Sequence, residues 1–71
     1  MKITVTTKNG TTVNGELARI SDTSIAIRRD ELSVAMVENL RTLENATISH
    51  IADKWYIRLS MKRVQMYYFA D

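Results

Sequence analysis

Residues 3–27 read ITVTTKNGTTVNGELARISDTSIAI, and this stretch decides the predicted fold. Residues 1–7 read MKITVTT, in which apolar Ile3 and Val5 alternate with polar side chains and β-branched residues occupy positions 3–7. A period of two is typical of a strand with one buried face. The side chains on the predicted inner face are Ile3, Val5 and Thr7. Asn9 and Gly10 then predict a two-residue type I′ hairpin turn, because both residue types tolerate the positive φ that this turn requires.

Two more strands are predicted within the same stretch. Residues 11–20 form the second strand, and Gly15 lies inside it on the inner face. A glycine within a strand indicates a sharp bend, a bulge or the close approach of another backbone segment. Residues 21–24, SDTS, predict a turn because Ser and Asp side chains bond nearby backbone amides. Residues 25–28 predict a third strand, with Ile25 and Ile27 on the inner face.

The segment 32–43 supports two interpretations. Its apolar residues recur at helical spacing, with Asp30 as the N-cap of a short amphipathic helix. The residues on that apolar stripe are Leu32, Ala35, Met36, Leu40 and Leu43. The alternative is a strand over residues 33–37, a tight turn over 38–40 and a short strand from Arg41. We favour the strand interpretation because the surrounding pattern is a meander of strands.

The last third of the chain predicts two further strand segments. Apolar side chains alternate with polar or basic ones over residues 55–61. Lys62 and Arg63 mark a turn or a bulge, after which the alternation resumes over residues 64–68. The side chains on the predicted inner face are Trp55, Ile57, Leu59, Met61, Val64, Met66 and Tyr68.

These segments together predict one mainly-β domain over residues 1–71. We expect a small antiparallel barrel of five to seven strands, with one short helix within 31–44 as the alternative. A chain of this size buries only roughly 60% of the surface exposed by its unfolded form. Such domains are stabilised by disulfides, metals or self-association. The chain has no Cys, so disulfides are excluded and a homo-oligomer is expected.

The sequence also bounds the setting of the protein. Apolar runs are only a few residues long, which predicts no membrane-spanning segment and no membrane partner. Because Cys is absent, a reducing cytoplasm is the default expectation. Charge is distributed in three blocks, with basic residues in excess over 1–29 and 54–71 and acidic residues in excess over 30–53.

The quoted stretch, followed by SVAMVENLRTLE at residues 33–44, resembles the Sm-like and SH3-like small β-barrels. The shared features are a first strand, a tight turn, a bent second strand with a Gly before a Leu, and a polar turn into a third strand. The resemblance covers about residues 2–44. Ala26 stands near the place of the Asn that reads a base in the Sm motif, and the Arg-Gly of the second Sm motif is missing. Residues 54–71 are interpreted as a C-terminal strand extension beyond the usual core, which pairs with a neighbouring subunit.

Signals of catalysis or of a cofactor are absent from the sequence. His50 is the one histidine, and the adjacent Ser49 would point to the opposite face of a strand. No P-loop, nucleophile elbow, zinc-ligand spacing or dinucleotide motif occurs, and the acidic residues match no cation-binding loop. We therefore predict a protein that is not an enzyme and that carries no metal and no cofactor.

Two hypotheses for function remain. In the first, a basic and aromatic face binds single-stranded nucleic acid, because cations neutralise phosphates and rings stack on bases. Its candidate residues are Arg28, Arg29, Tyr56, Arg58, Lys62, Arg63 and Tyr67. The same aromatic residues would equally suit the core or a protein interface.

In the second hypothesis the chain is an accessory protein of a phage or mobile element that inhibits a host defence protein. An acidic face would then imitate nucleic-acid phosphates against a basic partner. Its candidate residues are Asp30, Glu31, Glu38 and Glu44. Sequestration of a small nucleotide at subunit junctions is a third possibility.

Overall fold

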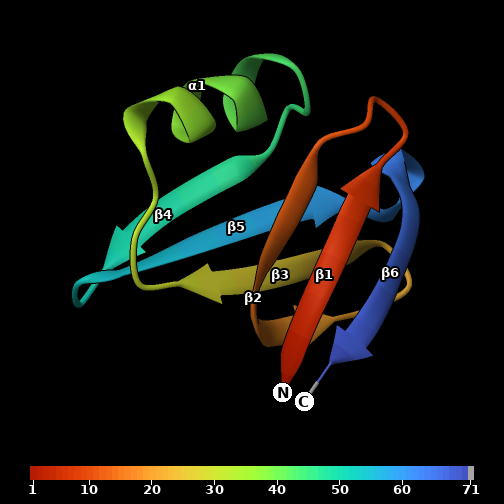
Figure 1. The fold of residues 1–71 in the computed structure, drawn as a ribbon, viewed down its shortest axis with the longest axis horizontal. Helices are drawn as coiled ribbons and strands as arrows, with labels where there is room; N and C mark the ends of the chain where they lie inside the picture. The colour runs from red at the N-terminus through yellow and green to blue at the C-terminus, as the bar shows by residue number, and fades with distance from the viewer. Residues whose placement is uncertain (71) are drawn as a thin grey trace.

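The fold consists of one strongly coiled antiparallel sheet and two short helices, and the computed structural model describes residues 1–70 (Figure 1). In chain order the elements are β1 (Lys2–Thr7), β2 (Thr12–Ile20), β3 (Ser24–Arg29), α1 (Val34–Thr42), β4 (Thr47–Ile51), β5 (Lys54–Ser60), the 3₁₀ helix η1 (Met61–Arg63) and β6 (Val64–Ala70). The strand order in the sheet is β4-β5-β3-β2-β1-β6. The mainly-β prediction is confirmed. Closure into a barrel is not confirmed, because the sheet described here ends in two edges, β4 and β6.

The core lies inside the coil of the sheet and is almost entirely aliphatic. Seven of its eight fully buried hydrophobic side chains come from strands, and the eighth comes from α1. They are Ile3, Val5, Val13, Ile25, Ile27, Leu40, Ile57 and Leu59. The alternation read from the sequence therefore predicts the inner faces of β1, β3 and β5 correctly.

The β1–β2 hairpin is confirmed, but its turn is not of type I′. The backbone N–H of Gly10 donates to the carbonyl of Thr7 at 3.0 Å, and Gly10 alone in this turn has a positive φ, of 88°. This is a three-residue loop in which a type I turn is followed by a left-handed glycine. Asn9 keeps an ordinary negative φ, and its side chain turns toward the segment after α1.

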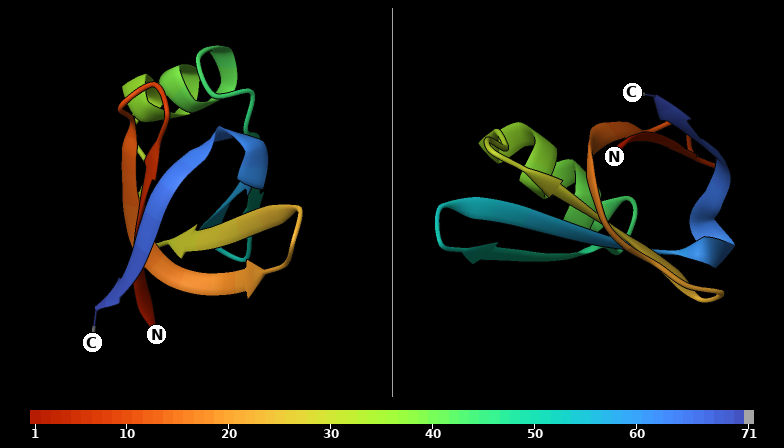
Figure 2. Two further views of the ribbon diagram at one scale, coloured as in Figure 1. Left: turned by 90° about the vertical axis from the view of Figure 1, so that its right-hand side faces the viewer. Right: turned by 90° about the horizontal axis from the view of Figure 1, so that it is seen from below.

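β2 connects the two halves of the coil, and β3 approaches it closely at Gly15. Figure 2 shows β2 curving away from β1 to run along β3. A Cβ placed on Gly15 would lie 2.6 Å from the carbonyl oxygen of Arg28 and 2.8 Å from Cγ2 of Ile27. Of the three explanations that the sequence left open for this glycine, the structure shows the close approach of another backbone segment.

The favoured strand interpretation of residues 33–37 is wrong, since this segment begins a helix. Ser33 is the N-cap of α1, and its Oγ accepts a hydrogen bond from the backbone N–H of Met36 at 3.1 Å. Asp30, the cap suggested by the sequence, lies three residues too early. The helix forms because Leu40 reaches the core from the open side of the sheet, where α1 packs near β4 (Figure 1).

The first strand of the C-terminal third, β5, is part of the core and is not an extension beyond it. β5 lies between β3 and β4, and its Ile57 and Leu59 are fully buried. The interpretation of residues 54–71 as an extension is therefore wrong for β5. β6 pairs with β1 of the same chain. Trp55 is only half-buried, and its ring stacks on His50 with centroids 4.0 Å apart.

The predicted inner face of β6 is also wrong. Val64 is half-buried, but Met66 and Tyr68 are 52% and 51% exposed. In the β1–β6 register Met66 lies opposite Thr6 and Tyr68 lies opposite Thr4, so both face away from the core that Ile3 and Val5 line. Over residues 1–70, no helix has the length and apolar character that crossing a membrane would require.

We expect the substitution Gly15→Ala to destabilise the protein by about 1–3 kcal/mol, since its methyl group must displace the β3 backbone. The free energy of unfolding from urea titration measures this effect. Gly10→Asn is the control, because a side chain there meets nothing within 4 Å and Asn tolerates a positive φ. Its effect should stay within about 0.5 kcal/mol. Equal effects of the two substitutions would contradict the role assigned to Gly15.

Candidate functional site

The outer face of the sheet brings together an aromatic ring and several arginines. Because Ile57 of β5 faces the core, its neighbours Tyr56 and Arg58 face outward. Tyr56 lies directly opposite Arg28 in the β3–β5 register, and Arg58 follows two residues along the same face. Opposite residues in antiparallel strands have Cβ atoms about 5 Å apart, so the Tyr56 and Arg28 side chains are neighbours.

A bulge in β2 adds Arg19 to the same face. Leu17 lies opposite Ile27 on the core side, and the register then shifts so that Arg19 lies opposite Ala26 on the outer side. Strict alternation from Leu17 would have turned Arg19 inward, and for this reason Arg19 is not among the contacts predicted from the sequence. An arginine at a nominally inward position is the signal that could have revealed the bulge. We call Arg19, Arg28, Tyr56 and Arg58 the outer patch.

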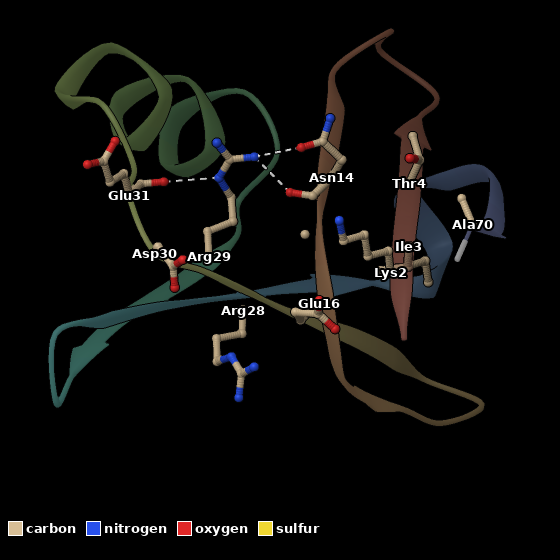
Figure 3. Close-up of a pocket in the computed structure, with 11 residues that line it drawn as sticks. Lys2, Ile3, Thr4, Asn14, Glu16, Arg28, Arg29, Asp30, Glu31 and Ala70 are labelled. Atoms are coloured by element: carbon tan, nitrogen blue, oxygen red, sulfur yellow. Dashed lines mark hydrogen bonds between the residues drawn. The ribbon is translucent and has the colours of Figure 1, made fainter.

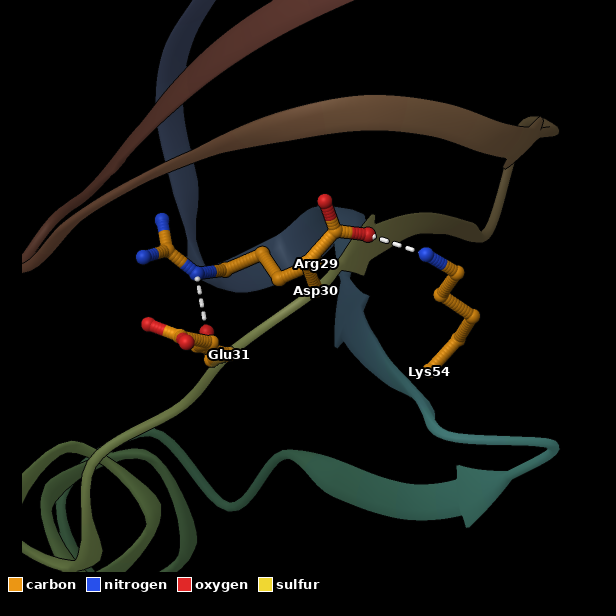
Figure 4. Close-up of polar contacts among 4 residues, drawn as sticks. All are labelled: Arg29, Asp30, Glu31 and Lys54. Carbon is orange, nitrogen blue, oxygen red and sulfur yellow. Dashed lines mark hydrogen bonds and ion pairs between the residues drawn. The ribbon is translucent and has the colours of Figure 1, made fainter.

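The outer patch keeps a positive charge because nearby carboxylates are held by other cations. Glu16 lies opposite Arg28 on the same outer face, and its Oε2 lies 3.0 Å from the N-terminal amino group of Met1. Asp30 Oδ1 lies 2.5 Å from Nζ of Lys54 (Figure 4). Over residues 1–70 the guanidinium groups of Arg19 and Arg28 make no hydrogen bond or ion pair, and Arg58 donates only to Thr47 Oγ1 at 3.5 Å.

A groove of about 710 Å³ adjoins the outer patch at Arg28. It lies between the β1–β2 hairpin and the segment that follows β3 (Figure 3). Its lining includes three basic residues and three acidic residues, which are Lys2, Arg28, Arg29, Glu16, Asp30 and Glu31. The groove is therefore of mixed charge, in contrast to the outer patch.

Two of the predicted nucleic-acid contacts are used within the fold. Arg29 is half-buried and bridges two segments: Nη1 donates to the backbone oxygen and Oδ1 of Asn14 at 2.7 and 2.8 Å, and Nε donates to the carbonyl of Glu31 at 3.0 Å (Figures 3 and 4). Arg63 is also half-buried, and its Nη1 donates to the carbonyl of Leu43 at 3.2 Å. Both arginines are therefore structural residues of the fold.

The remaining predicted contacts lie apart from the outer patch. Lys62 is exposed, but it belongs to η1 beyond the end of β5. Tyr67 belongs to β6, and β1, β2 and β3 lie between it and β5 in the sheet. Of the residues predicted from the sequence, Arg28, Tyr56 and Arg58 come together.

The predicted acidic face does not form, because Glu44 is buried inside the fold. Only 1% of this residue is exposed, and its Oε2 accepts a hydrogen bond from Thr7 Oγ1 at 2.8 Å. Asn9 Nδ2 lies 3.4 Å from the other carboxylate oxygen. Glu31 and Glu38 are exposed, the latter on α1, and Asp30 is paired with a lysine. The four acidic residues therefore do not form one surface, because one is buried, one is paired with a lysine and two are exposed.

The described chain offers no evident metal centre. In residues 1–70 no group of three or more His, Cys, Asp or Glu side chains is arranged to hold a metal ion. Ser49 lies opposite Tyr56 and His50 lies opposite Trp55, so the two side chains point to opposite faces of β4.

Comparison of the chain with protein-family models, with curated proteins and with solved structures found no match. The resemblance to Sm-like and SH3-like barrels stays a prediction from the sequence.

We expect Glu44→Ala to destabilise the protein by about 1–3 kcal/mol, because it leaves the buried Thr7 hydroxyl without its acceptor. Chemical denaturation of the purified variant measures this loss. Glu38→Ala removes an exposed carboxylate from α1 and should change stability by no more than about 0.5 kcal/mol. If Glu44→Ala left the stability unchanged, the carboxylate of Glu44 would not anchor the segments around it.

The Asp30 carboxyl provides a test by titration. The hydrogen bond from Lys54 and the charge of its ammonium group hold the pKa of Asp30 below the ordinary value of 3.8, with a smaller contribution from Arg28. The pair therefore stabilises the fold above pH 3.8, and this contribution is lost as the pH falls through the lower folded-state pKa.

An NMR titration of the Asp30 side chain should accordingly give a midpoint below 3.8. Lys54→Met should move the midpoint upward, because it removes both the donor and the charge. Lys62→Met removes a distant lysine and should leave the midpoint in place. If Lys54→Met left the Asp30 midpoint unchanged, the ion pair would not persist in solution.

Proposed function

We propose that this protein is a non-catalytic module that binds single-stranded nucleic acid on the outer face of β3 and β5. The observation that carries the proposal is the position of Tyr56, which lies beside Arg28 across the strands and two residues from Arg58 on the same face. Arg19 extends the same positive surface across β3. Hydrogen bonds within the fold leave these guanidinium groups largely free.

The chemistry of this arrangement suits a flexible polyanion. Arginine guanidinium groups donate paired hydrogen bonds to phosphate oxygens, and a neighbouring ring stacks on a base. Each stacked base contributes about 1–3 kcal/mol, and stacking depends little on base identity. The expected ligand is therefore a single strand bound with weak sequence preference and with strong dependence on salt.

A single strand fits this face better than a duplex. In a duplex the flat faces of the bases are covered by their neighbours, so the ring of Tyr56 could reach only phosphates and sugars. The hypothesis that an acidic face imitates nucleic-acid phosphates has no comparable support, because Glu44 is buried and Asp30 is paired with Lys54.

The double substitution of Arg28 and Arg58 by alanine should weaken binding of a fluorescein-labelled oligothymidylate by at least about tenfold at low salt. Fluorescence anisotropy over a salt series measures both affinity and its salt dependence. The slope of log affinity against log salt should fall by about 1.4, since each lost phosphate contact removes about 0.7.

The matched control removes two exposed basic side chains elsewhere, with the same change in net charge. Lys8 lies in the β1–β2 turn and Arg41 lies on α1. Their double substitution by alanine should leave at least half of the affinity. Equal losses in the two double variants, or no oligonucleotide binding by the wild type, would refute the proposal. Tight binding of a mononucleotide instead would assign the surface to a small ligand.

The role of the ring is tested separately at Tyr56. Tyr56→Phe keeps the stacking surface and should bind nearly as well as the wild type. Tyr56→Leu removes the ring and should weaken binding by about tenfold, which corresponds to the loss of one stacked base. Because Tyr56 is half-buried, thermal unfolding of both variants must confirm that they remain folded. Loss of binding in the Phe variant would contradict a stacking role.

A further inference from the structure

The edge strand β6 carries the most conspicuous apolar surface of the described chain. Four consecutive large side chains are exposed on it: Met66 by 52%, Tyr67 by 40%, Tyr68 by 51% and Phe69 by 47%. Successive residues of a strand point to opposite faces, so the apolar surface covers both faces of the edge. Large exposed apolar patches on small proteins mark interaction surfaces.

The backbone of β6 is equally open to pairing. It pairs with β1 on one side, and over residues 1–70 no strand lies on its other side. Residues 64–70, VQMYYFA, include no charged residue and no proline. The register shift opposite Thr6 and Thr7 places one bulge at the start of the strand, and Met66 to Ala70 then pair regularly. Monomeric proteins usually protect such an edge with charges, prolines or a covering segment.

We propose that β6 is a dimer interface, in which the β6 strands of two copies pair antiparallel about a two-fold axis. The two sheets would then join into one continuous sheet. This proposal concerns the β6 edge, whereas the outer patch lies on β2, β3 and β5. The dimer and the nucleic-acid proposal can therefore fail independently.

The distribution of charge in and beside β6 favours antiparallel pairing with the β6 strand of a second copy. An uncharged strand brings no like charges together when it pairs with itself. The basic residues Lys62 and Arg63 immediately precede β6. Antiparallel pairing places these two basic ends at opposite ends of the interface, whereas parallel pairing would place them side by side.

The area available is sufficient for such a dimer. A buried aromatic side chain contributes about 150–250 Å², so roughly half of each of three rings, with part of Met66, amounts to about 400 Å² per copy. The strand backbone and the flanking side chains raise the total over two copies to about 1,000 Å², which is the size at which specific interfaces begin.

The other edge of the sheet is a poorer partner for β6. β4 is shorter, with five residues against seven, and α1 packs near it. Pairing of β6 with β4 of another copy would be head-to-tail and would build rings or open chains. The two-fold arrangement is complete with two copies, so the mass of the assembly distinguishes it from rings and open chains.

Sedimentation velocity and size exclusion with light scattering should give a wild-type mass of twice 8.2 kDa at high concentration, with reversible dissociation on dilution. The double substitution Met66→Lys and Tyr68→Lys should weaken self-association by at least about tenfold, because it brings like charges together across the pair. These two residues are the most exposed of the four, so their replacement perturbs the monomer least.

The control variant adds two lysines to α1, at Val34 and Thr42, which are also exposed. It should remain dimeric. A wild type that stays monomeric at millimolar concentration, a larger ring, or equal dissociation of the control variant would overturn the proposal.

Hydrogen exchange on the wild type provides a test that needs no variant. Amides of residues 64–70 should exchange more slowly as the protein concentration rises, and amides of residues 47–51 should not change. Concentration-independent exchange over β6 would overturn the proposal even if the lysine variant failed to fold.

Discussion

The fold depends on the close contact between the backbones of β2 and β3 at Gly15. Because Gly15 has no side chain, the carbonyl of Arg28 can approach to a distance that any Cβ would prevent. β2 can therefore pair with β1 over its first half and with β3 over its second half. This continuity wraps one sheet around its own core, so that a chain of 71 residues buries eight aliphatic side chains completely.

The same coiled geometry decides which charges reach the surface together. The bulge after Leu17 turns Arg19 outward, and the β3–β5 register places Tyr56 next to Arg28. Each residue is ordinary in the sequence, and the positive aromatic surface arises only from cross-strand pairing. Arg29, next to Arg28 in the sequence, faces the other way and ties β2 to the segment after β3.

A second contact, between polar side chains, joins the β1–β2 turn to the segment after α1. Glu44 accepts the hydroxyl hydrogen bond of Thr7, and Thr7 Oγ1 also accepts from the backbone N–H of Thr11 at 3.1 Å. The hairpin turn and the end of α1 are thereby held together. A buried carboxylate is stable only with such partners, and nothing in the local sequence distinguishes Glu44 from the exposed Glu38. For this reason its role could not be predicted from the sequence.

The sequence by itself determined five of the six strands, because a period of two and short turn signals are local properties. The inner faces of β1, β3 and β5 and the hairpin at Gly10 were predictable, whereas β4 was not predicted and close approach was only one of three explanations for Gly15. Of the candidate site it determined Arg28, Tyr56 and Arg58. Tertiary structure alone decided that residues 34–42 are helical, since Leu40 needs the open side of the sheet to bury itself. It also decided that Arg19 faces outward and that the apolar side chains of β6 stay exposed, because bulges, edges and covering layers depend on partners far away in the chain.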